Sequence, residues 1–417
     1  MTNAAARGSD WDAGSTPRSL RDGLILSVLA LSAGGFTVVG ASANAPLIRI
    51  DLHLSEVGVG AIASAAYLGA MSTSRIGGRL TDRIGPGHVI VVSLLTMALG
   101  IGLVAIAPHA AWLYVGAAVA GLGYGAVNPA TTVLANPPSA RRRGLVMSVK
   151  QSGVPLGGIA GGLVLPTVGS AVGWRWACVV PVIVCMALAL VAQLRGNYRA
   201  PKAETRGAAT PTGVRLRLPM GYGYGFLMAG VQVSIFAFAA VFLTEARHWS
   251  AGRAGLGVSL LLLGGVAGRP LWGWLSDLFP LQRLRILQYA SIAGALTLLA
   301  LPLAPGSTVG VALVSVGLCS VGWNGVYVAA VAEASEPDSI GATTGAALLL
   351  INMGAVAFPV LVGVLVQQSG SWTYGWGACA ILSALAFVVI MIGKRRDDVG
   401  VTADDGHGRL HPAAEEV

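Results

Sequence analysis

Few charged side chains lie within the long apolar stretches of this chain, and these few are the first candidates for chemistry. Lys150, followed by Gln151 and Ser152, is the only lysine inside such a stretch. Facing a water-filled cavity, its ammonium would bind an anion such as a carboxylate; alternatively, its long stem would carry the charge to the lipid headgroups. Arg75 and Arg269 lie within about two helical turns of the ends of their stretches, where we expect them to pair with groups near the adjoining loops.

Neutral polar residues mark the walls of a candidate cavity. A buried amide or phenol in lipid needs a hydrogen-bond partner, so each such residue either bridges two helices or faces a polar cavity. Bridging is slightly favoured for any single residue, whereas their concentration in certain stretches favours a shared polar site. The candidate substrate-binding residues are Asn44, Tyr67, Asn128, Lys150, Gln151, Gln232, Asn324 and Asn352.

The apolar stretches themselves define the fold class. Hydrophobic residues make up 54% of the chain and charged residues 11%, and the mean hydropathy is +0.71, which excludes a soluble globule. Each stretch has roughly 18–25 residues, enough for a helix to cross a hydrocarbon core of about 30 Å, and helices satisfy their own backbone hydrogen bonds there. We predict an all-α membrane protein with twelve transmembrane helices at Leu24–Ile48, Val57–Ile76, Ile90–Ala107, Ala111–Leu134, Leu145–Val168, Trp176–Leu194, Tyr222–Leu243, Ala254–Leu275, Ile286–Leu303, Val309–Val331, Gly341–Val366 and Tyr374–Gly393.

Lysine and arginine are concentrated on one side of this arrangement, which predicts its orientation. The tails, the central linker and the loops after the second, fourth and eighth helices carry most of them, while the opposite loops carry only Arg49, Arg175, Arg247 and Arg253. Both termini and the linker are therefore expected in the cytoplasm, with the protein in the cell membrane. The net charge of +9 then reports topology, and no nucleic-acid partner is expected. The predicted units are a tail (1–22), a six-helix bundle (23–194), a linker (195–219), a second six-helix bundle (220–393) and a tail (394–417).

The second half of the chain repeats the first. Asp82, in a loop that reads Gly-Arg-Leu-Thr-Asp-Arg-Ile-Gly from Gly78, and Asp277, in a loop that reads Gly-Trp-Leu-Ser-Asp, are 195 positions apart (277 − 82). Asn128 and Asn324, each behind a Gly-Leu pair, are 196 positions apart (324 − 128), and this pair could equally be structural symmetry mates. Parallel repeats in membrane proteins are typical of transporters whose site lies between the halves.

At these residues the chain resembles the major facilitator superfamily, whose hallmark is a Gly-x-Leu-x-Asp-Arg-x-Gly loop after the second helix. The resemblance covers roughly residues 22–394 and implies two pseudo-symmetric six-helix bundles that work by alternating access. It also implies gating roles for Gly78, Asp82, Arg83 and Asp277. Gly78 permits close helix approach, and when the cytoplasmic side is closed Asp82 faces the start of the eleventh helix and Asp277 that of the fifth. The alternative is a plain surface loop with a charged turn.

Two departures from the superfamily's patterns narrow the expected function. Ala117 stands near the place where many proton-coupled members carry an arginine, and the fifth helix reads Gly153-Val154-Pro155-Leu156-Gly157-Gly158, with its proline displaced from the drug-antiporter pattern. Both lower the expectation of a proton-driven drug exporter. We expect a secondary active or facilitative transporter of a small organic solute, with an anion such as a carboxylate favoured by Lys150. The alternatives are an exporter of amphipathic drugs or metabolites and, remotely, a non-transporting membrane sensor.

Further partners and cofactors are constrained by what the sequence lacks. No Asp, Glu or His lies at mid-depth in any predicted helix, so proton coupling would fall to Lys150, a peripheral acid or a protonated substrate. Exchange against a counter-substrate and facilitated diffusion need no such group. Nucleotide-binding loops, metal-ligand spacings and converging catalytic groups are missing, so we expect no cofactor, no metal and no enzyme activity. The remaining partners are the solute and the lipid bilayer, and the protein is expected to be a monomer.

Overall fold

Twelve helical spans run through the computed structural model, which describes residues 17–135, 146–147, 149–195, 218–278, 283–334 and 340–404. Each described span is long and apolar enough to cross a membrane, as the sequence predicted. Their limits are Arg21–Asp51, Glu56–Thr81, Pro86–Ala105, Ala110–Leu134, Val149–Val172, Trp174–Leu194, Pro219–Glu245, Ala251–Ser276, Arg283–Leu303, Val309–Val331, Ala346–Ser369 and Trp372–Gly393. Most of the predicted linker and tails lie outside the described residues, so the predicted domain limits stay predictions.

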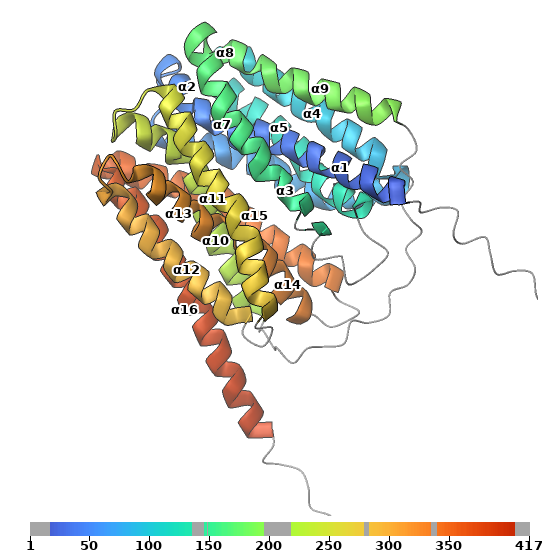
Figure 1. Ribbon diagram of the computed structural model, residues 1–417, viewed down its shortest axis with the longest axis vertical. Coiled ribbons are helices and arrows are strands. Elements are labelled where there is room, and N and C mark those ends of the chain that lie inside the picture. Colours follow the sequence, from blue (N-terminus) through green and yellow to red (C-terminus); the bar gives the residue numbers. More distant parts are fainter. Residues whose placement is uncertain are drawn as a thin grey trace, which may run out of the picture.

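The helices of the first half form one packed group (Figure 1). In chain order they are α1 (Pro17–Gly34), η1 (Gly35–Val39), η2 (Gly40–Asn44), α2 (Ala45–Asp51), α3 (Glu56–Ile84), α4 (Pro86–Ala105), α5 (Ala110–Leu134), α7 (Gly153–Val172), α8 (Trp174–Ala177) and α9 (Val179–Leu194). The helix ends follow local chemistry: Ser55 caps α3 by accepting a hydrogen bond from the Gly58 amide at 3.2 Å.

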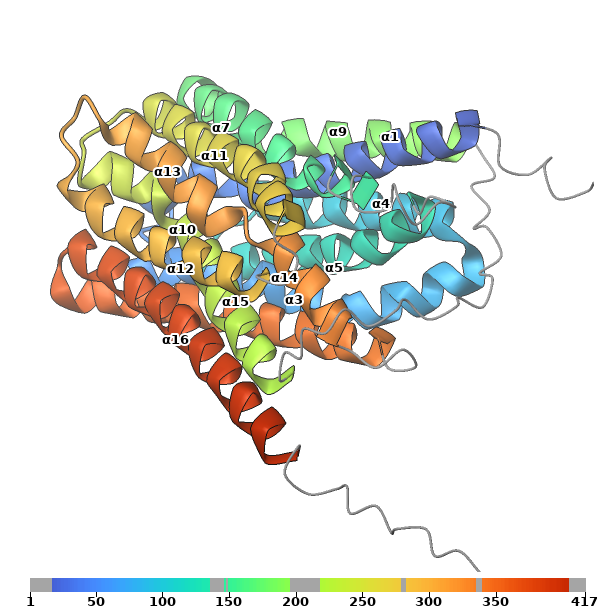
Figure 2. The ribbon, with the colours of Figure 1, turned by 60° about the horizontal axis from the view of Figure 1, so that its bottom comes forward.

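The second half forms the other group, shown in yellow-green to red in Figures 1 and 2. Its elements are α10 (Leu218–Glu245), α11 (Ala251–Leu278), α12 (Arg283–Ala300), η4 (Leu301–Leu303), α13 (Val309–Val321), α14 (Asn324–Ala334), α15 (Ile340–Ser369) and α16 (Trp372–Asp404). We call the two groups the first and second bundle. The membrane face at which α2 ends and α3 begins is called the predicted extracellular face, and the opposite one the predicted cytoplasmic face.

The repeat is visible in how glycines pack the same helix pairs in both bundles. A Cβ atom on Gly121 of α5 would lie 1.9 Å from the Ala66 carbonyl oxygen of α3, and one on Gly317 of α13 would lie 1.7 Å from the Leu261 oxygen of α11. The two glycines are 196 positions apart (317 − 121). Only glycine allows these backbones to approach so closely. The expectation of two related bundles is therefore confirmed.

The two bundles meet through small residues in their predicted extracellular halves. A Cβ atom on Gly60 of α3 would lie 2.4 Å from the Pro359 oxygen of α15, and one on Gly255 of α11 would lie 2.1 Å from the Gly162 oxygen of α7. Ser64 of α3 also donates a hydrogen bond to the Val356 oxygen of α15 at 2.6 Å. Figures 1 and 2 both show α7 beside α11 at this junction. Backbone-to-backbone packing thus holds this side of the molecule closed.

Candidate functional site between the bundles

One arginine reaches across the boundary between the bundles. Arg269 of α11 is half-buried, and its Nη1 donates a hydrogen bond to the backbone oxygen of Gln151, at the start of the fifth span. Its Nε atom is buried and has no hydrogen-bond partner among the described residues. The sequence expectation that Arg269 pairs near its adjoining loop is wrong for this contact, because its side chain extends to the other bundle.

Two tyrosines of the first bundle lie beside this arginine. Tyr67 of α3 and Tyr124 of α5 are half-buried and pack edge to face, with ring centroids 6.3 Å apart. Both phenol groups lie close enough to Arg269 to interact with its charge. Polar groups from α3, α5, α11 and the fifth span therefore lie near one another at the boundary between the bundles.

Lys150, the neighbour of Gln151, is buried with only 2% of its surface exposed. Its ammonium donates hydrogen bonds to the Asn128 side-chain oxygen at 3.1 Å and to the Thr132 hydroxyl at 2.6 Å. The headgroup interpretation of Lys150 therefore does not describe this conformation, because the charge lies within the protein. Lys150 therefore bridges the fifth span and α5, and Asn128 has the bridging role that was one of its two expected roles. Both acceptors are neutral, so they leave the charge of Lys150 uncompensated.

The basic pair Lys150 and Arg269 lacks an acidic counterpart. In the described part of the chain, neither side chain has a carboxylate within ion-pair distance. The side-chain oxygen of Gln151 is also buried without a hydrogen-bond partner there. A buried charge without a counter-charge is destabilising. An anion held between the bundles would relieve this.

The other predicted binding residues lie apart from this cluster. In the second bundle, the Asn324 amide donates to the Gln232 side-chain oxygen at 2.9 Å, which joins α14 to α10, and Asn352 is half-buried on α15. Asn44 is buried at 1% exposure in the first bundle, where it lines a largely apolar cavity of about 60 Å³. Both polar atoms of its amide lack a partner among the described residues. No contact in the described part of the chain links these four residues to Lys150.

Comparison with known proteins identifies the family. The sequence profile of the Major Facilitator Superfamily matches residues 25–323 and, in a second match, residues 220–413. The chain belongs to the Major Facilitator Superfamily. It is similar to the gentisate transporter of Corynebacterium glutamicum, with 30% identity over 82% of this chain and 81% of the relative. It is also similar to the hexuronate transporter of Bacillus subtilis, with 24% identity over 85% of this chain and 91% of the relative.

The fold is shared with solved structures of the superfamily. A bacterial homologue of the human lysosomal transporter Spinster, in an inward-facing and occupied conformation, superposes with a TM-score of 0.71 at 17% identity, over 92% of this chain and 98% of that structure. The chain is therefore a superfamily transporter of the multi-pass membrane type, and its family is not one of enzymes.

The superfamily's loop motif is open in this conformation. A Cβ atom on Gly78 would meet nothing within 4 Å, and the same holds for Gly273 in the second loop, so the expected close approach at Gly78 is wrong here. Gly77 has that role instead, since its added Cβ would lie 2.7 Å from Ala126. Arg83 is exposed. The side chains of Asp82 and Asp277 lie outside the described residues, so their gating role remains a prediction.

Sequence reasoning missed Arg269 and Tyr124 as members of the site. The signal for Arg269 was present, because any arginine inside a membrane span is a candidate functional residue. Its nearness to the loop after the eighth helix favoured a local partner instead. Tyr124 carried no signal of its own; it becomes visible only when α5 is placed beside Tyr67 of α3.

Proposed function

We propose that this protein moves a small organic anion, with carboxylates as the preferred class, across the membrane by alternating access. The observation that carries the proposal concerns two cations, Lys150 of the first bundle and Arg269 of the second. Lys150 precedes Gln151 in the chain, and Arg269 donates to the Gln151 backbone oxygen. Among the described residues, the hydrogen-bond partners of both cations are neutral. A solute held by groups of both bundles can couple its own binding to their relative movement. Gentisate and hexuronates, which the relatives are named for, are carboxylates at neutral pH.

An exporter of amphipathic drugs is less well supported. Such a protein needs a broad apolar cavity between its bundles, whereas the side chains that meet there include a guanidinium, two phenols and an amide. The largely apolar cavity beside Asn44 has a volume of only about 60 Å³ and is lined by the first bundle except for Ala237 of α10. The chemistry at the boundary thus favours a compact, charged solute.

The first experiment measures binding by the purified protein. Thermal unfolding with gentisate, glucuronate, a neutral sugar and a cationic drug should show stabilisation by one or more carboxylates, because a ligand of the folded state stabilises by mass action. The affinity for that carboxylate should then fall by about tenfold or more in Arg269→Gln, because the bound carboxylate loses the positive charge of Arg269 as its partner. Uptake into proteoliposomes provides the second measurement.

Arg253→Gln is the matched control. It removes the same charge from an exposed position at the start of α11, away from the boundary cluster. It should leave carboxylate affinity unchanged. Stabilisation by the cationic drug alone, or an unchanged affinity in Arg269→Gln, would overturn the proposal.

A further inference from the structure

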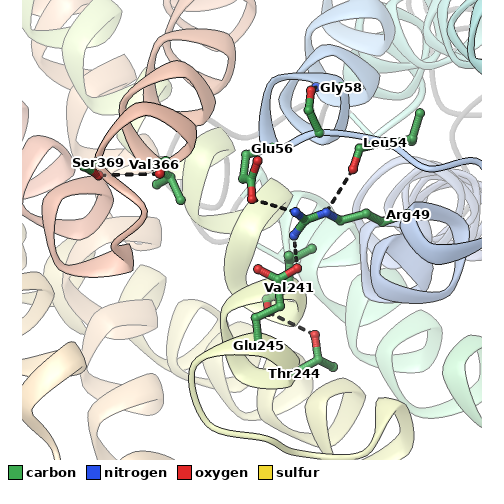
Figure 3. Close-up of polar contacts among 10 residues, drawn as sticks. Arg49, Leu54, Glu56, Gly58, Val241, Thr244, Glu245, Val366 and Ser369 are labelled. Atoms are coloured by element: carbon green, nitrogen blue, oxygen red, sulfur yellow. Dashed lines mark hydrogen bonds and ion pairs between the residues drawn. The ribbon is translucent and has the colours of Figure 1, made fainter.

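A second group of charges lies at the predicted extracellular face. Its residues are at the ends of α2 and α10 and at the start of α3, and none of them belongs to the proposed substrate site. Arg49, in the last turn of α2, lies between Glu56, the first residue of α3, and Glu245, the last residue of α10 (Figure 3). Its Nη2 is 2.6 Å from Glu56 Oε1, and its Nη1 forms an ion pair with Glu245 Oε1. The Nε atom donates to the Leu54 backbone oxygen at 3.0 Å. All three guanidinium nitrogens are therefore engaged.

The carboxylates of Glu56 and Glu245 have different roles in this cluster. Glu56 and Arg49 belong to the same bundle, so their pair fixes the orientation of the guanidinium. Glu245 belongs to the second bundle, and its pair with Arg49 is the one ion pair that crosses between the bundles among the described residues. Because Glu56 already orients the guanidinium, Arg49 loses less conformational freedom when it binds Glu245 than a freely moving arginine would.

Solvent reaches this cluster. Arg49 and Glu245 line a groove of about 590 Å³ together with His53 and Trp249. The side chains of Arg49 and Glu56 are 19% and 18% exposed, and that of Glu245 is 38% exposed. A half-exposed ion pair contributes a modest stabilisation. Such a pair can bias the equilibrium between two conformations without locking one of them.

We infer that Arg49, oriented by Glu56, and Glu245 form a latch that favours closure of the predicted extracellular side. The pair lies over the small-residue junction at Gly60 and Ser64, where the bundles touch. Opening this side requires the first turn of α3 to separate from α15, and the end of α10 to separate from α2. The Arg49–Glu245 pair must then break, whereas the Arg49–Glu56 pair moves with its bundle and stays intact.

The test is a distance measurement that needs neither a substrate nor a known orientation. Spin labels are placed at Ile106→Cys of the first bundle and Leu303→Cys of the second, which are 72% and 78% exposed at this face, in a background whose four buried cysteines are replaced by alanine. Pulsed electron paramagnetic resonance then reports the separation of the bundles. In Glu56→Gln/Glu245→Arg two arginines face each other with no carboxylate of this cluster beside them, so attraction becomes repulsion and the ratio of long to short distances should rise by about two- to tenfold.

Two further variants separate a latch from general loosening. Asp51→Asn breaks a pair with Arg175 on the same face, 2.5 Å long, within the first bundle, and should leave the distances unchanged. The triple variant Arg49→Glu/Glu56→Gln/Glu245→Arg restores the crossing pair with its charges exchanged and should return the distances to those of the parent. Unchanged distances in Glu56→Gln/Glu245→Arg, or an equal effect of Asp51→Asn, would overturn the latch. Failure of the proposed anion function would leave this result untouched.

Discussion

The basic residues of the boundary cluster are unusual because their partners are neutral. Lys150 donates to an amide and a hydroxyl, and Arg269 to a backbone oxygen. These contacts satisfy donors but leave both charges uncompensated by any carboxylate in the described ranges. Structural lysines and arginines inside membranes are usually paired with acids or backbone carbonyls. Arg269 meets that description in part and Lys150 does not, so Lys150 is the sharper test of an anion site.

Lys150→Met should separate a binding role from a structural one. Methionine keeps a long unbranched side chain but removes a buried charge that has no counter-charge, so the melting temperature without ligand should stay the same or rise. The stabilisation by a carboxylate should fall, with affinity reduced by about tenfold or more. Lys150→Arg should also bind poorly, because guanidinium and ammonium groups differ in geometry.

Thermal unfolding with and without the carboxylate measures both effects. Thr132→Val is the matched control, since it removes one hydrogen bond of Lys150 and keeps the charge. A lower melting temperature in Lys150→Met together with full ligand stabilisation would show that the lysine only joins α5 to the fifth span.

At the scale of helices, the sequence predicted what depends on length and repetition. Twelve spans follow from the apolar stretches, and the related bundles follow from the offset between Asp82 and Asp277. The faces of the helices were harder to predict. Span 1 passes through the π-helix η1 and the 3₁₀-helix η2, which end at Asn44. Neither has 3.6 residues per turn, so the direction of Asn44 could not be projected from the start of the span.

The superfamily's motif begins inside the last two turns of α3 and offers an element-scale prediction through two neighbouring glycines. Gly77→Ala would place a methyl group 2.7 Å from Ala126 and should lower the melting temperature by several degrees, because overpacking costs about 1–3 kcal/mol. Gly78→Ala meets open space in this conformation and should leave the melting temperature nearly unchanged. If Gly78 packs closely when the cytoplasmic side closes, this variant should still slow transport.

Melting curves and initial uptake rates in proteoliposomes measure the two effects separately. Gly273→Ala, at the corresponding place near the end of α11, is a parallel variant with equally open surroundings. Normal uptake by Gly78→Ala would contradict a gating role for Gly78. An equal loss of stability in Gly77→Ala and Gly78→Ala would contradict the packing described for α3 and α5.

For the whole molecule, the contacts between the bundles are unevenly distributed along the membrane normal. Glycine packing, the Ser64 hydrogen bond and the Arg49–Glu245 pair lie in the half that contains the predicted extracellular face. In the opposite half, the hydrogen bond from Arg269 to the Gln151 backbone also crosses between the bundles. The motif glycines of the opposite half, Gly78 and Gly273, are uncontacted. This arrangement fits a conformation whose predicted extracellular side is closed. Which compartment that face meets depends on orientation, which rests on loop charges.

Orientation can be measured with two single cysteines in the alanine background. Thr210→Cys lies in the basic linker, which the loop charges place in the cytoplasm. Gly306→Cys lies in the exposed turn between η4 and α13, on the predicted extracellular face, where an added side chain meets nothing within 4 Å. An impermeant thiol reagent should label Gly306→Cys in intact cells and Thr210→Cys only in inverted vesicles. Because the loop charges predict opposite faces for the two sites, each serves as the control for the other. Labelling of Thr210→Cys from outside, with protection of Gly306→Cys, would reverse the orientation, and the latch would then close the cytoplasmic side.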